Sequence, residues 1–467
     1  MDTFITLLVA AIILLVLWVR ARLKEETSAG LPPGSMGLPL IGESIEFVQK
    51  KVEFFKEKHI QYGRVFKTCL FGKSIIRVYG SDNIRKIIQG ENKIVRSSYP
   101  TSVRKLIGTQ SISMSHGDTH KSKKRELMKY LSPEFFHNHT PVLARAIADR
   151  IEQWCKKPEI DLYQECQKLF IELAAKFLVN IDINEADVAE LQRHLQTFTD
   201  NMFCLPFNIP GFGFHKAMKA KIKMRQLLVS ALNKSANNND VTAEYCSVLQ
   251  GLKQSSSTDF NDEIVMVDSI IDLLFSGSQT VNSAGFSLAH KLSKRPDIRE
   301  RLMQDIDKLG LTSPNEPVCA NDLTEMTYVD AVVKETLRLL PPVGGAYRTA
   351  IESFELDGYT VPKDWSVVFS IRETHNHADS VQNPDVFNPD RWLQPEFGKD
   401  KYSFLPFGGG ARICPGQAYA KMILKLFSIE FTRSCSPSVI KDSELKFWPT
   451  PSPKDQVLAK IERVEAL

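Results

Sequence analysis

The sequence predicts a mostly α-helical protein of the α+β class, with one large helical domain that carries small β-sheets. Three observations predict this class. The chain has 467 residues, which is enough for an extensive core. Apolar residues recur with the helical period from about residue 115 to 340. The alternation that is typical of strands is confined to residues 60–80 and 350–372.

Composition excludes several classes of protein. With 24 Gly and 24 Pro, the chain is neither collagen-like nor of low complexity. The 59 basic and 55 acidic residues nearly balance, so we predict no nucleic-acid partner. None of the eight cysteines forms a Cys-x-x-Cys pair, which predicts reduced thiols in a protein that faces the cytosol.

The N-terminus predicts a membrane anchor over residues 1–24. An apolar run from Phe4 to Val19 is followed by Arg20, Arg22 and Lys24. A cleaved signal peptide would carry its basic residues before the run, and a buried core helix is rarely so uniformly apolar at a terminus. Basic residues on the C-terminal side keep the rest of the chain in the cytosol. We predict a single-pass signal anchor in the endoplasmic reticulum membrane, then a Pro/Gly hinge over residues 25–40.

The remaining residues, 41–467, form the predicted catalytic domain. Strand-like segments at 65–68 and 75–79 flank a turn at Gly72-Lys73, and the later β segment has a turn at Asp357-Gly358. Residues 203–214 are an apolar loop that dips into a bilayer, roofs an apolar cavity or packs between two helices. A last helix follows Pro415. The predicted helices before it are residues 140–155, 161–179, 185–203, 215–235, 261–293, 296–309 and 327–340.

The sharpest motif is Phe407-Gly408-Gly409-Gly410-Ala411-Arg412-Ile413-Cys414-Pro415-Gly416. A chance match to its fixed residues is on the order of one in ten thousand. The glycines let the backbone fold against a flat ring, and Cys414 falls at a helix N-terminus, which favours a thiolate able to ligate haem iron. Arg412 can pair with a propionate, and Phe407 can shield the sulfur. A buried free cysteine would leave the glycines unexplained, and a dinucleotide loop would need a further glycine.

On these residues the sequence resembles the cytochrome P-450 superfamily, from Leu31 to about Pro451. The resemblance implies the cytochrome P-450 fold and haem b (iron protoporphyrin IX), with Cys414 as the axial ligand of the iron. It further implies a buried Glu-Arg-Arg cluster of Glu335, Arg338 and Arg391 that holds the cysteine loop in place.

Residues 261–293 resemble the family's central helix above the haem. In Ser276-Gly277-Ser278-Gln279-Thr280, the resemblance implies that Gly277 opens the helix for dioxygen and that the Thr280 hydroxyl guides protons to it. Gln279 departs from the pattern, because the family usually has a carboxylate there. An amide cannot ionise, although it can orient a water. Proton delivery is therefore the step that this departure affects.

His120 and Lys124 stand where the family has a Trp and an Arg that bind the haem propionates, and the resemblance implies that they replace them. Arg348 matches a third propionate-binding position. The helix around His120 also carries Lys121, Lys123 and Arg125. We predict that these form a basic face on which an acidic electron donor docks.

The segment from Val333 to Arg348 resembles the retinoic acid hydroxylases, and the segments 99–104 and 414–420 resemble the related plant terpenoid oxidases equally well. Both relationships imply a small apolar substrate. By this resemblance the substrate pocket is lined by Tyr99, Val343, Gly344 and Ala346.

The predicted function is that of a haem-thiolate monooxygenase. A reductase (NADPH-cytochrome reductase) supplies electrons from NADPH, and one atom of O2 enters a C–H bond of retinoic acid or a related retinoid. A terpenoid or sterol substrate is the alternative within this class. The absence of an acid at Gln279 also admits a reductase-independent isomerase or dehydratase, and a catalytically silent haem-binding or sensor protein is a further alternative.

Overall fold

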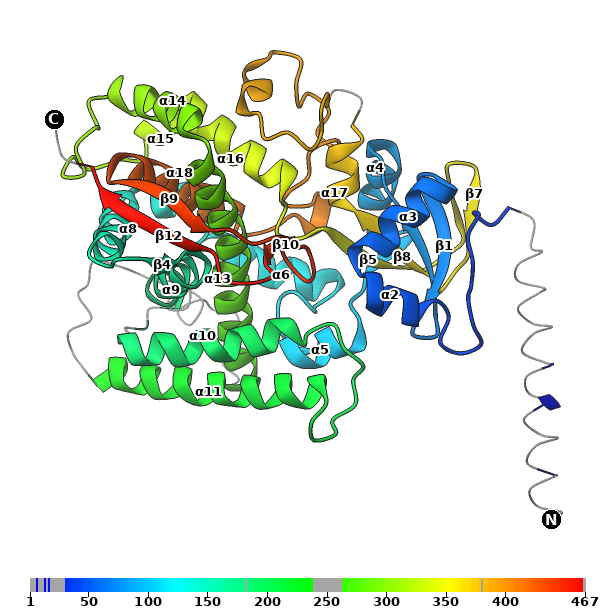
Figure 1. Ribbon diagram of the computed structural model, residues 1–467. Coiled ribbons are helices and arrows are strands. Elements are labelled where there is room, and N and C mark those ends of the chain that lie inside the picture. Colours follow the sequence, from blue (N-terminus) through cyan, green and yellow to red (C-terminus); the bar gives the residue numbers. More distant parts are fainter. Residues whose placement is uncertain are drawn as a thin grey trace. The chain divides into compact units, whose positions relative to one another are not determined.

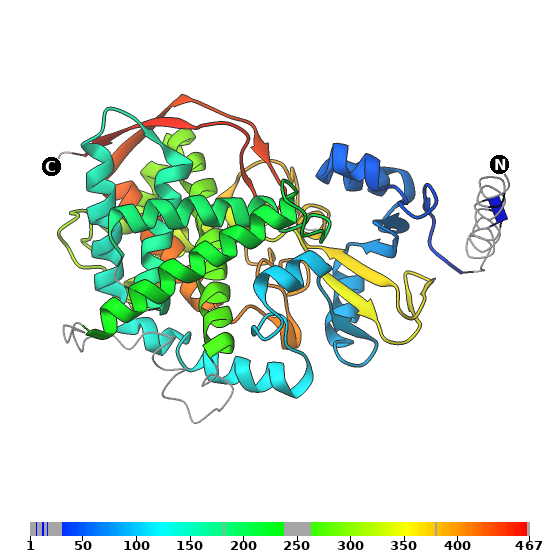
Figure 2. The same ribbon diagram turned by 90° about the horizontal axis from the view of Figure 1, so that it is seen from below.

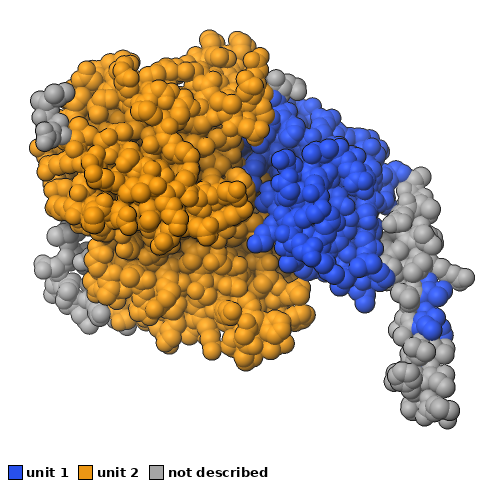
Figure 3. All heavy atoms as spheres, viewed as in Figure 1, with its two compact units in different colours: residues 1–98, 345–378 blue, residues 99–344, 379–467 orange. Residues whose placement is uncertain are grey.

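The computed structural model describes residues 30–179, 181, 183–237, 263–378 and 381–464, together with residues 6, 12, 13 and 16. The chain divides into two units (Figures 1 and 3). Unit 1 comprises residues 1–98 and 345–378, and unit 2 comprises residues 99–344 and 379–467. Apart from the four isolated residues, the predicted anchor lies outside the described residues, as does residue 246, one of the eight cysteines.

Unit 1 is built around a five-stranded sheet with the order β1-β2-β8-β5-β3. β2 and β8 run parallel, although they come from opposite halves of the chain. The β1–β2 turn is formed by Phe71 and Gly72, both at positive φ, so it lies one residue earlier than predicted. The strands are β1 (Val65–Leu70), β2 (Lys73–Val78), β3 (Val95–Ser97), β5 (Gly345–Ala350) and β8 (Ser366–Ser370).

In the part of unit 1 that the structure describes, four helices and a hairpin accompany this sheet. The hairpin turns at Asp357 and Gly358, as predicted, and both residues have positive φ. The hinge segment is tied to the sheet, because Lys67 N donates to Pro33 O at 2.8 Å. The elements are α2 (Ser44–Lys50), α3 (Val52–Tyr62), α4 (Ser81–Gln89), α17 (Ile371–Asn376), β6 (Phe354–Leu356) and β7 (Tyr359–Val361).

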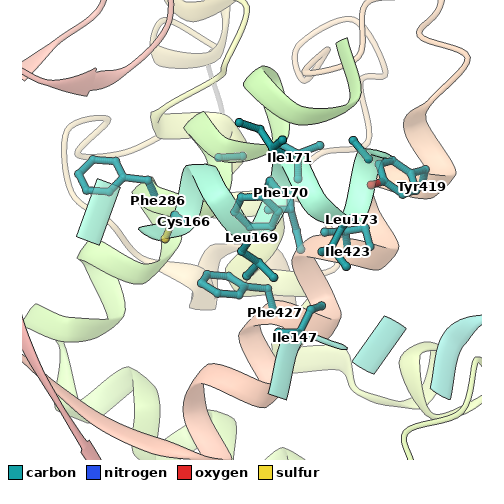
Figure 4. Close-up of a cluster of buried hydrophobic side chains, with 14 of the residues drawn as sticks. Ile147, Cys166, Leu169, Phe170, Ile171, Leu173, Phe286, Tyr419, Ile423 and Phe427 are labelled. Carbon is teal, nitrogen blue, oxygen red and sulfur yellow. The ribbon is translucent and has the colours of Figure 1, made fainter. Parts of the chain in front are cut away.

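Unit 2 is mostly helical and holds the largest hydrophobic core. Its long helix α13 (Glu263–Lys294) packs against α9 (Leu162–Ala174), α16 (Thr327–Leu339) and α18 (Gln417–Arg433). Figure 4 shows side chains from α8, α9, α13 and α18 gathered in this core. The ring centroids of Phe170 and Phe427 lie 5.4 Å apart, and burial of each such ring stabilises the fold by about 1.5–3 kcal/mol.

Two glycines set the close approach of α9 and α13. A Cβ at Gly277 would clash with Leu178, and a Cβ at Gly285 would clash with the ring of Phe170. Leu178 belongs to a π-helical turn, η1 (Ala175–Val179), that extends α9. Because neither glycine has a side chain, Leu178 and Phe170 can pack directly against the backbone of α13.

The other elements of unit 2 surround this core. The long helices α10 and α11 lie side by side in both ribbon views (Figures 1 and 2). The strands form two small sheets, with the orders β4-β12-β9 and β10-β11. The elements are α5 (Thr101–Ile107), α6 (Gly117–Met128), α7 (Pro133–His137), α8 (Thr140–Cys155), α10 (Glu185–Asp200), α11 (Gly213–Asn237), α14 (Pro296–Asp307), α15 (Asp322–Glu325), η3 (Pro389–Leu393), η4 (Gly410–Arg412), β4 (Ile160–Asp161), β9 (Cys435–Lys441), β10 (Leu445–Lys446), β11 (Ser452–Pro453) and β12 (Leu458–Arg463).

The predicted class is confirmed, because the chain is mostly helical with small sheets. All seven helices that the periodicity predicts are present, within a few residues of the predicted ends. Within the described residues, no helix has both the length and the apolar character that a membrane crossing requires. The anchor and the division into anchor, hinge and catalytic domain stay predictions.

Candidate functional site

The cysteine loop folds as its glycines predict. Gly408 and Gly410 have φ values of 68° and 60°, a region that favours glycine. The short helix η4 follows, and Cys414 N donates to Phe407 O at 2.9 Å, which closes the loop just before α18. Cys414 is therefore held by its own backbone at the N-terminal end of α18.

The Cys414 thiol has an unusual environment for a free cysteine. Its side chain is exposed, yet desolvation by the surrounding protein is the main cause that raises the pKa of its thiol. The Gly416 N–H and the charge of Lys124 lower this pKa, in the predicted direction, but burial is the larger effect. A metal ion bound to this sulfur would deprotonate it.

Basic groups gather beside this loop. Lys124 Nζ donates to Ala411 O at 3.0 Å and to Ile413 O at 2.7 Å, and Arg412 Nη2 donates to Ser115 O at 2.8 Å. The pKa of His120 is lowered to about 4, first by burial and then by Arg412, Lys124 and His116. Every group whose charge shifts the pKa of His120 is therefore a basic side chain. Lys124 and Arg412 are half-buried, and two such cations beside the cysteine loop fit a dianionic ligand such as the two propionates of haem.

The basic face of α6 differs in one residue from the prediction. Lys123 is buried, and its Nζ donates to Gln110 O at 2.8 Å. It anchors the segment that precedes α6 instead of facing solvent. Lys121 and Arg125 are exposed and remain available on that face.

Glu335, Arg338 and Arg391 form a buried ionic cluster. Glu335 Oε2 accepts from Arg338 Nε at 2.9 Å, and Glu335 Oε1 accepts from Arg391 Nε at 3.1 Å. The Asn388 N–H and Trp392 Nε1 add two more bonds to this carboxylate, each of 3.0 Å. The cluster thus joins α16 to the segment that contains η3.

The central helix α13 presents a partly open face near Thr280. Ser276 is exposed and Thr280 is half-buried, although the neighbouring turns are buried. These two residues are four apart and share one helix face, and Thr280 Oγ1 donates to Ser276 O at 2.7 Å. Gly277 lies in an unbroken helix and faces Leu178.

Asp272, one turn before Ser276, ties α13 to the loop that precedes α6. Ser113 Oγ donates to both Asp272 oxygens, at 3.0 and 2.8 Å, and Ser276 Oγ donates to Asp272 Oδ1 at 3.3 Å. The Ser115 carbonyl of the same loop binds Arg412. The loop is therefore anchored both to α13 and to the cysteine loop. The sequence did not identify the loop residues or Asp272 as part of the site. The helical period does place Asp272 on the same face of α13 as Thr280.

Gln279 points away from the open face of α13. It is 4% exposed, and its Oε1 accepts from Gln167 Nε2 of α9 at 3.1 Å. Sequence reasoning missed Gln167, because nothing in the local sequence marks it.

The family follows from a comparison with known proteins, since the family model for cytochrome P450 matches residues 32–464. The chain belongs to the cytochrome P450 family. This P450 is 32% identical to cytochrome P450 26A1 of Danio rerio over 98% of this chain and 95% of that protein. It is 36% identical to cytochrome P450 26B1 of Homo sapiens over 88% of this chain and 82% of that protein.

A solved structure, described as retinoic acid bound cyanobacterial CYP120A1, is similar to this P450 with a TM-score of 0.83. The sequences are 28% identical, and the match covers 94% of this chain and 100% of that one. The chain is therefore a P450 monooxygenase with haem b as its cofactor, a redox partner and a small apolar substrate.

The predicted site residues are distributed over both units. Unit 2 brings together Cys414, Arg412, Phe407, His120 and Lys124, and separately Glu335, Arg338 and Arg391. In the same unit, Tyr99 packs half-buried against the core and Val343 is 44% exposed beside Gly344.

Unit 1 contains the other two predicted residues, Ala346 and Arg348, both on β5. Arg348 Nε lies 2.6 Å from Glu91 Oε2, and both side chains are buried. The role of Arg348 in binding a haem propionate stays a prediction.

Proposed function

We propose that this P450 hydroxylates a retinoid, with retinoic acid as the first candidate, and that NADPH supplies the electrons through a reductase. The observation that supports the substrate is the likeness to the retinoic acid-bound structure over 94% of the chain. The resemblance of residues 333–348 to the retinoic acid hydroxylases supports it further.

In this proposal the cysteine loop and α6 bind the cofactor. Cys414 ligates the iron through its thiolate, and His120, Lys124, Arg412 and Arg348 hold the propionates. Lys124 and Arg412 now bind backbone carbonyls, which they would exchange for stronger ion pairs with the propionates. When bound, haem b supplies the activation of dioxygen.

The protein positions the substrate and the proton. The Thr280 hydroxyl donates to Ser276 O and lies on the open face of α13, where its Oγ1 would hold and pass a proton. Tyr99, Val343, Gly344 and Ala346 supply an apolar pocket wall that excludes water. Glu335, Arg338 and Arg391 keep the cysteine loop in place.

The proposal extends to docking and location. The exposed Lys121 and Arg125 of α6 receive the reductase. Residues 1–24 anchor the protein in the endoplasmic reticulum membrane, with the domain from residue 41 onward in the cytosol. The apolar loop between α10 and α11 supports a membrane contact, because Leu205, Phe207, Ile209 and Phe212 are about half exposed.

An optical titration of the purified, haem-loaded protein with retinoic acid tests the substrate. We expect a saturable shift of the iron from low to high spin, and, with reductase and NADPH, a product that carries one added oxygen atom. No shift with retinoic acid, together with a shift on addition of a diterpenoid or a sterol, would replace the retinoid with that substrate class.

The same optical spectra test whether Cys414 is the residue that ligates the haem iron. The Cys414→Ser variant should lose the thiolate-type spectrum, whereas Cys319→Ser, which alters another exposed cysteine, should keep it. A thiolate-type spectrum that survives in Cys414→Ser would contradict the assignment of the axial ligand.

A further inference from the structure

A lysine of α18 packs against the cysteine loop. Lys421 lies one turn after Gln417, the first residue of α18, and its Nζ lies 5.6 Å from the centroid of the Phe407 ring. Both the lysine and the phenylalanine are half-buried. An amine this close to the face of an aromatic ring is attracted to it. Lys421 is therefore held beside the loop that carries Cys414.

The charge of Lys421 is not neutralised by an acidic neighbour. Asp330 of α16 acts on it, but Asp330 Oδ1 binds Lys425 Nζ at 2.8 Å and Asp330 Oδ2 binds Lys334 Nζ at 2.7 Å. Burial lowers the pKa of Lys421, and the charges of Lys334 and Lys425 lower it further. In the described part of unit 2, three amines thus share one carboxylate, and positive charge is in excess beside the cysteine loop.

Packing alone does not require a cation at this position. Partial burial of a charge without a counter-ion destabilises a fold, whereas an uncharged side chain such as methionine would cover the same ring without that penalty. The excess charge is therefore available to a negative group nearby. The negative group of this loop is the thiolate of Cys414 when it is bound to the haem iron.

We propose that Lys421, held on the ring of Phe407, favours the one-electron reduction of the haem iron from the ferric to the ferrous state. The iron gains one electron and keeps its sulfur ligand, so the centre becomes more negative by one charge. A cation beside the cysteine loop lowers the free energy of that reduced state. Lys421 touches neither the iron nor the substrate. The inference rests on the proposed ligation of the iron by Cys414 and holds for any substrate.

The ring of Phe407 determines where the charge lies. Lysine has a flexible four-carbon stem, and its amine is strongly hydrated. Without the aromatic face, the amine would turn to solvent, where water and salt screen its charge. With the ring in place, the charge stays at the loop, where its effect on the iron is larger.

A potentiometric titration of the haem-loaded protein, without substrate or reductase, tests this proposal. At the potential that half reduces the wild type, the ratio of ferric to ferrous protein should rise at least about threefold in Lys421→Met, a downward shift of about 28 mV. Lys421→Arg keeps a cation on the ring, so its ratio should stay within about 1.5-fold of the wild type.

The matched control is Lys401→Met. Lys401 Nζ lies 5.2 Å from the centroid of the Tyr402 ring, which is outside the cysteine loop. This variant removes the same charge from a similar contact, and its ratio should stay within about 1.5-fold of the wild type. Equal ratios in Lys421→Met and Lys401→Met would overturn the proposal.

A double-mutant cycle tests the part of the ring. In the Phe407→Leu background, Lys421→Met should change the ratio by less than about 1.5-fold, because the amine has already turned to solvent. An undiminished change in that background would show that the ring does not hold the charge in place, and would overturn the proposal.

Docking of an electron donor is a different role for Lys421 and has a different signature. Lys421→Met would then slow reduction by the reductase and leave the equilibrium ratio unchanged, which would overturn the proposal. The proposed ligation fails separately, if Cys414→Ser keeps the thiolate-type spectrum. If that spectrum is lost and Lys421→Met leaves the ratio unchanged, only the role of Lys421 fails.

Discussion

Glu335 on α16 and Gln279 on α13 are both buried in unit 2, yet their surroundings differ. The carboxylate of Glu335 accepts five hydrogen bonds, from Arg338, Arg391, Trp392 and the Asn388 N–H. The amide of Gln279 has one bond, to Gln167, and one atom with no described partner.

The difference shows that two equally buried polar side chains can have different roles, depending on how completely they are hydrogen-bonded. A fully bonded charge in a low-dielectric interior has a single favourable arrangement, which suits a cluster that fixes the cysteine loop. A partly bonded amide can exchange one partner for a water without breaking an ion pair. We therefore expect the Glu335 cluster to be rigid and the bonded pair of Gln279 and Gln167 to be adjustable.

The largest expected effect is the loss of the Glu335 carboxylate. Glu335→Ala leaves two buried guanidinium groups without their partner, so the free energy of unfolding should fall by about 3–5 kcal/mol. Urea unfolding followed by circular dichroism measures this. Glu430→Ala is the matched control, because Glu430 and Arg433 form another buried pair. Both should destabilise, but only Glu335→Ala should lower the fraction of protein that carries thiolate-ligated haem. An equal loss of ligation in both would contradict a specific role.

An effect of intermediate size is expected for the bonded pair of Gln167 and Gln279. Gln167→Leu or Gln279→Leu alone should lower the free energy of unfolding by about 1–3 kcal/mol, since each leaves its partner unsatisfied. The double variant removes both partners and should lose less than the sum of the two. Strict additivity in a double-mutant cycle would show that the two amides do not act together.

A smaller effect is expected for Lys124, which bonds two carbonyls of the cysteine loop. Lys124→Met should lower the free energy of unfolding by about 1 kcal/mol, because the bonds are partly open to solvent. Lys121→Met, on the exposed side of the same helix, should change it by less than about 0.5 kcal/mol. Equal urea midpoints for the two variants would count against this anchoring.

The smallest effect concerns the buried carboxyl of Asp272 on α13. Burial raises its pKa, against the hydrogen bonds from Ser113 and Ser276. The folded state therefore binds the proton more tightly than the unfolded chain. The resulting stabilisation is present below the ordinary pKa of about 3.9 and is lost as the pH rises through the folded value. Asn at this position cannot titrate, so wild type should lose stability relative to Asp272→Asn as the pH increases from about 4. A gain with increasing pH would show that the pKa is lowered instead.

The sequence predicted the local elements well and the cross-chain contacts poorly. The predicted helix over residues 140–155 has the observed ends, because its period and the proline in its first turn are local signals. The Cys414 loop was predicted for the same reason. The prediction that Lys123 belongs to the exposed basic face of α6 was wrong, because its side-chain amine donates to Gln110 O.

Contacts between distant segments had no such signal. That Gln279 faces Gln167 depends on how α13 is rotated against α9, which Gly277 and Gly285 set through packing. The bond between Ser113 and Asp272 joins residues 159 positions apart. A single sequence gives the period of a helix and leaves its rotation about its axis to tertiary packing.

The parallel pairing of β2 with β8 has a consequence for the order of synthesis. Ile75 pairs with Ser366, which leaves the ribosome 291 residues later. At about 5–20 residues per second, the nascent β2 strand waits roughly 15–60 s for its neighbour. During that interval one edge of the β1–β2 hairpin is bare and can pair with strands of other chains. Until β8 has been made, this N-terminal hairpin is therefore exposed to mispairing in the newborn chain.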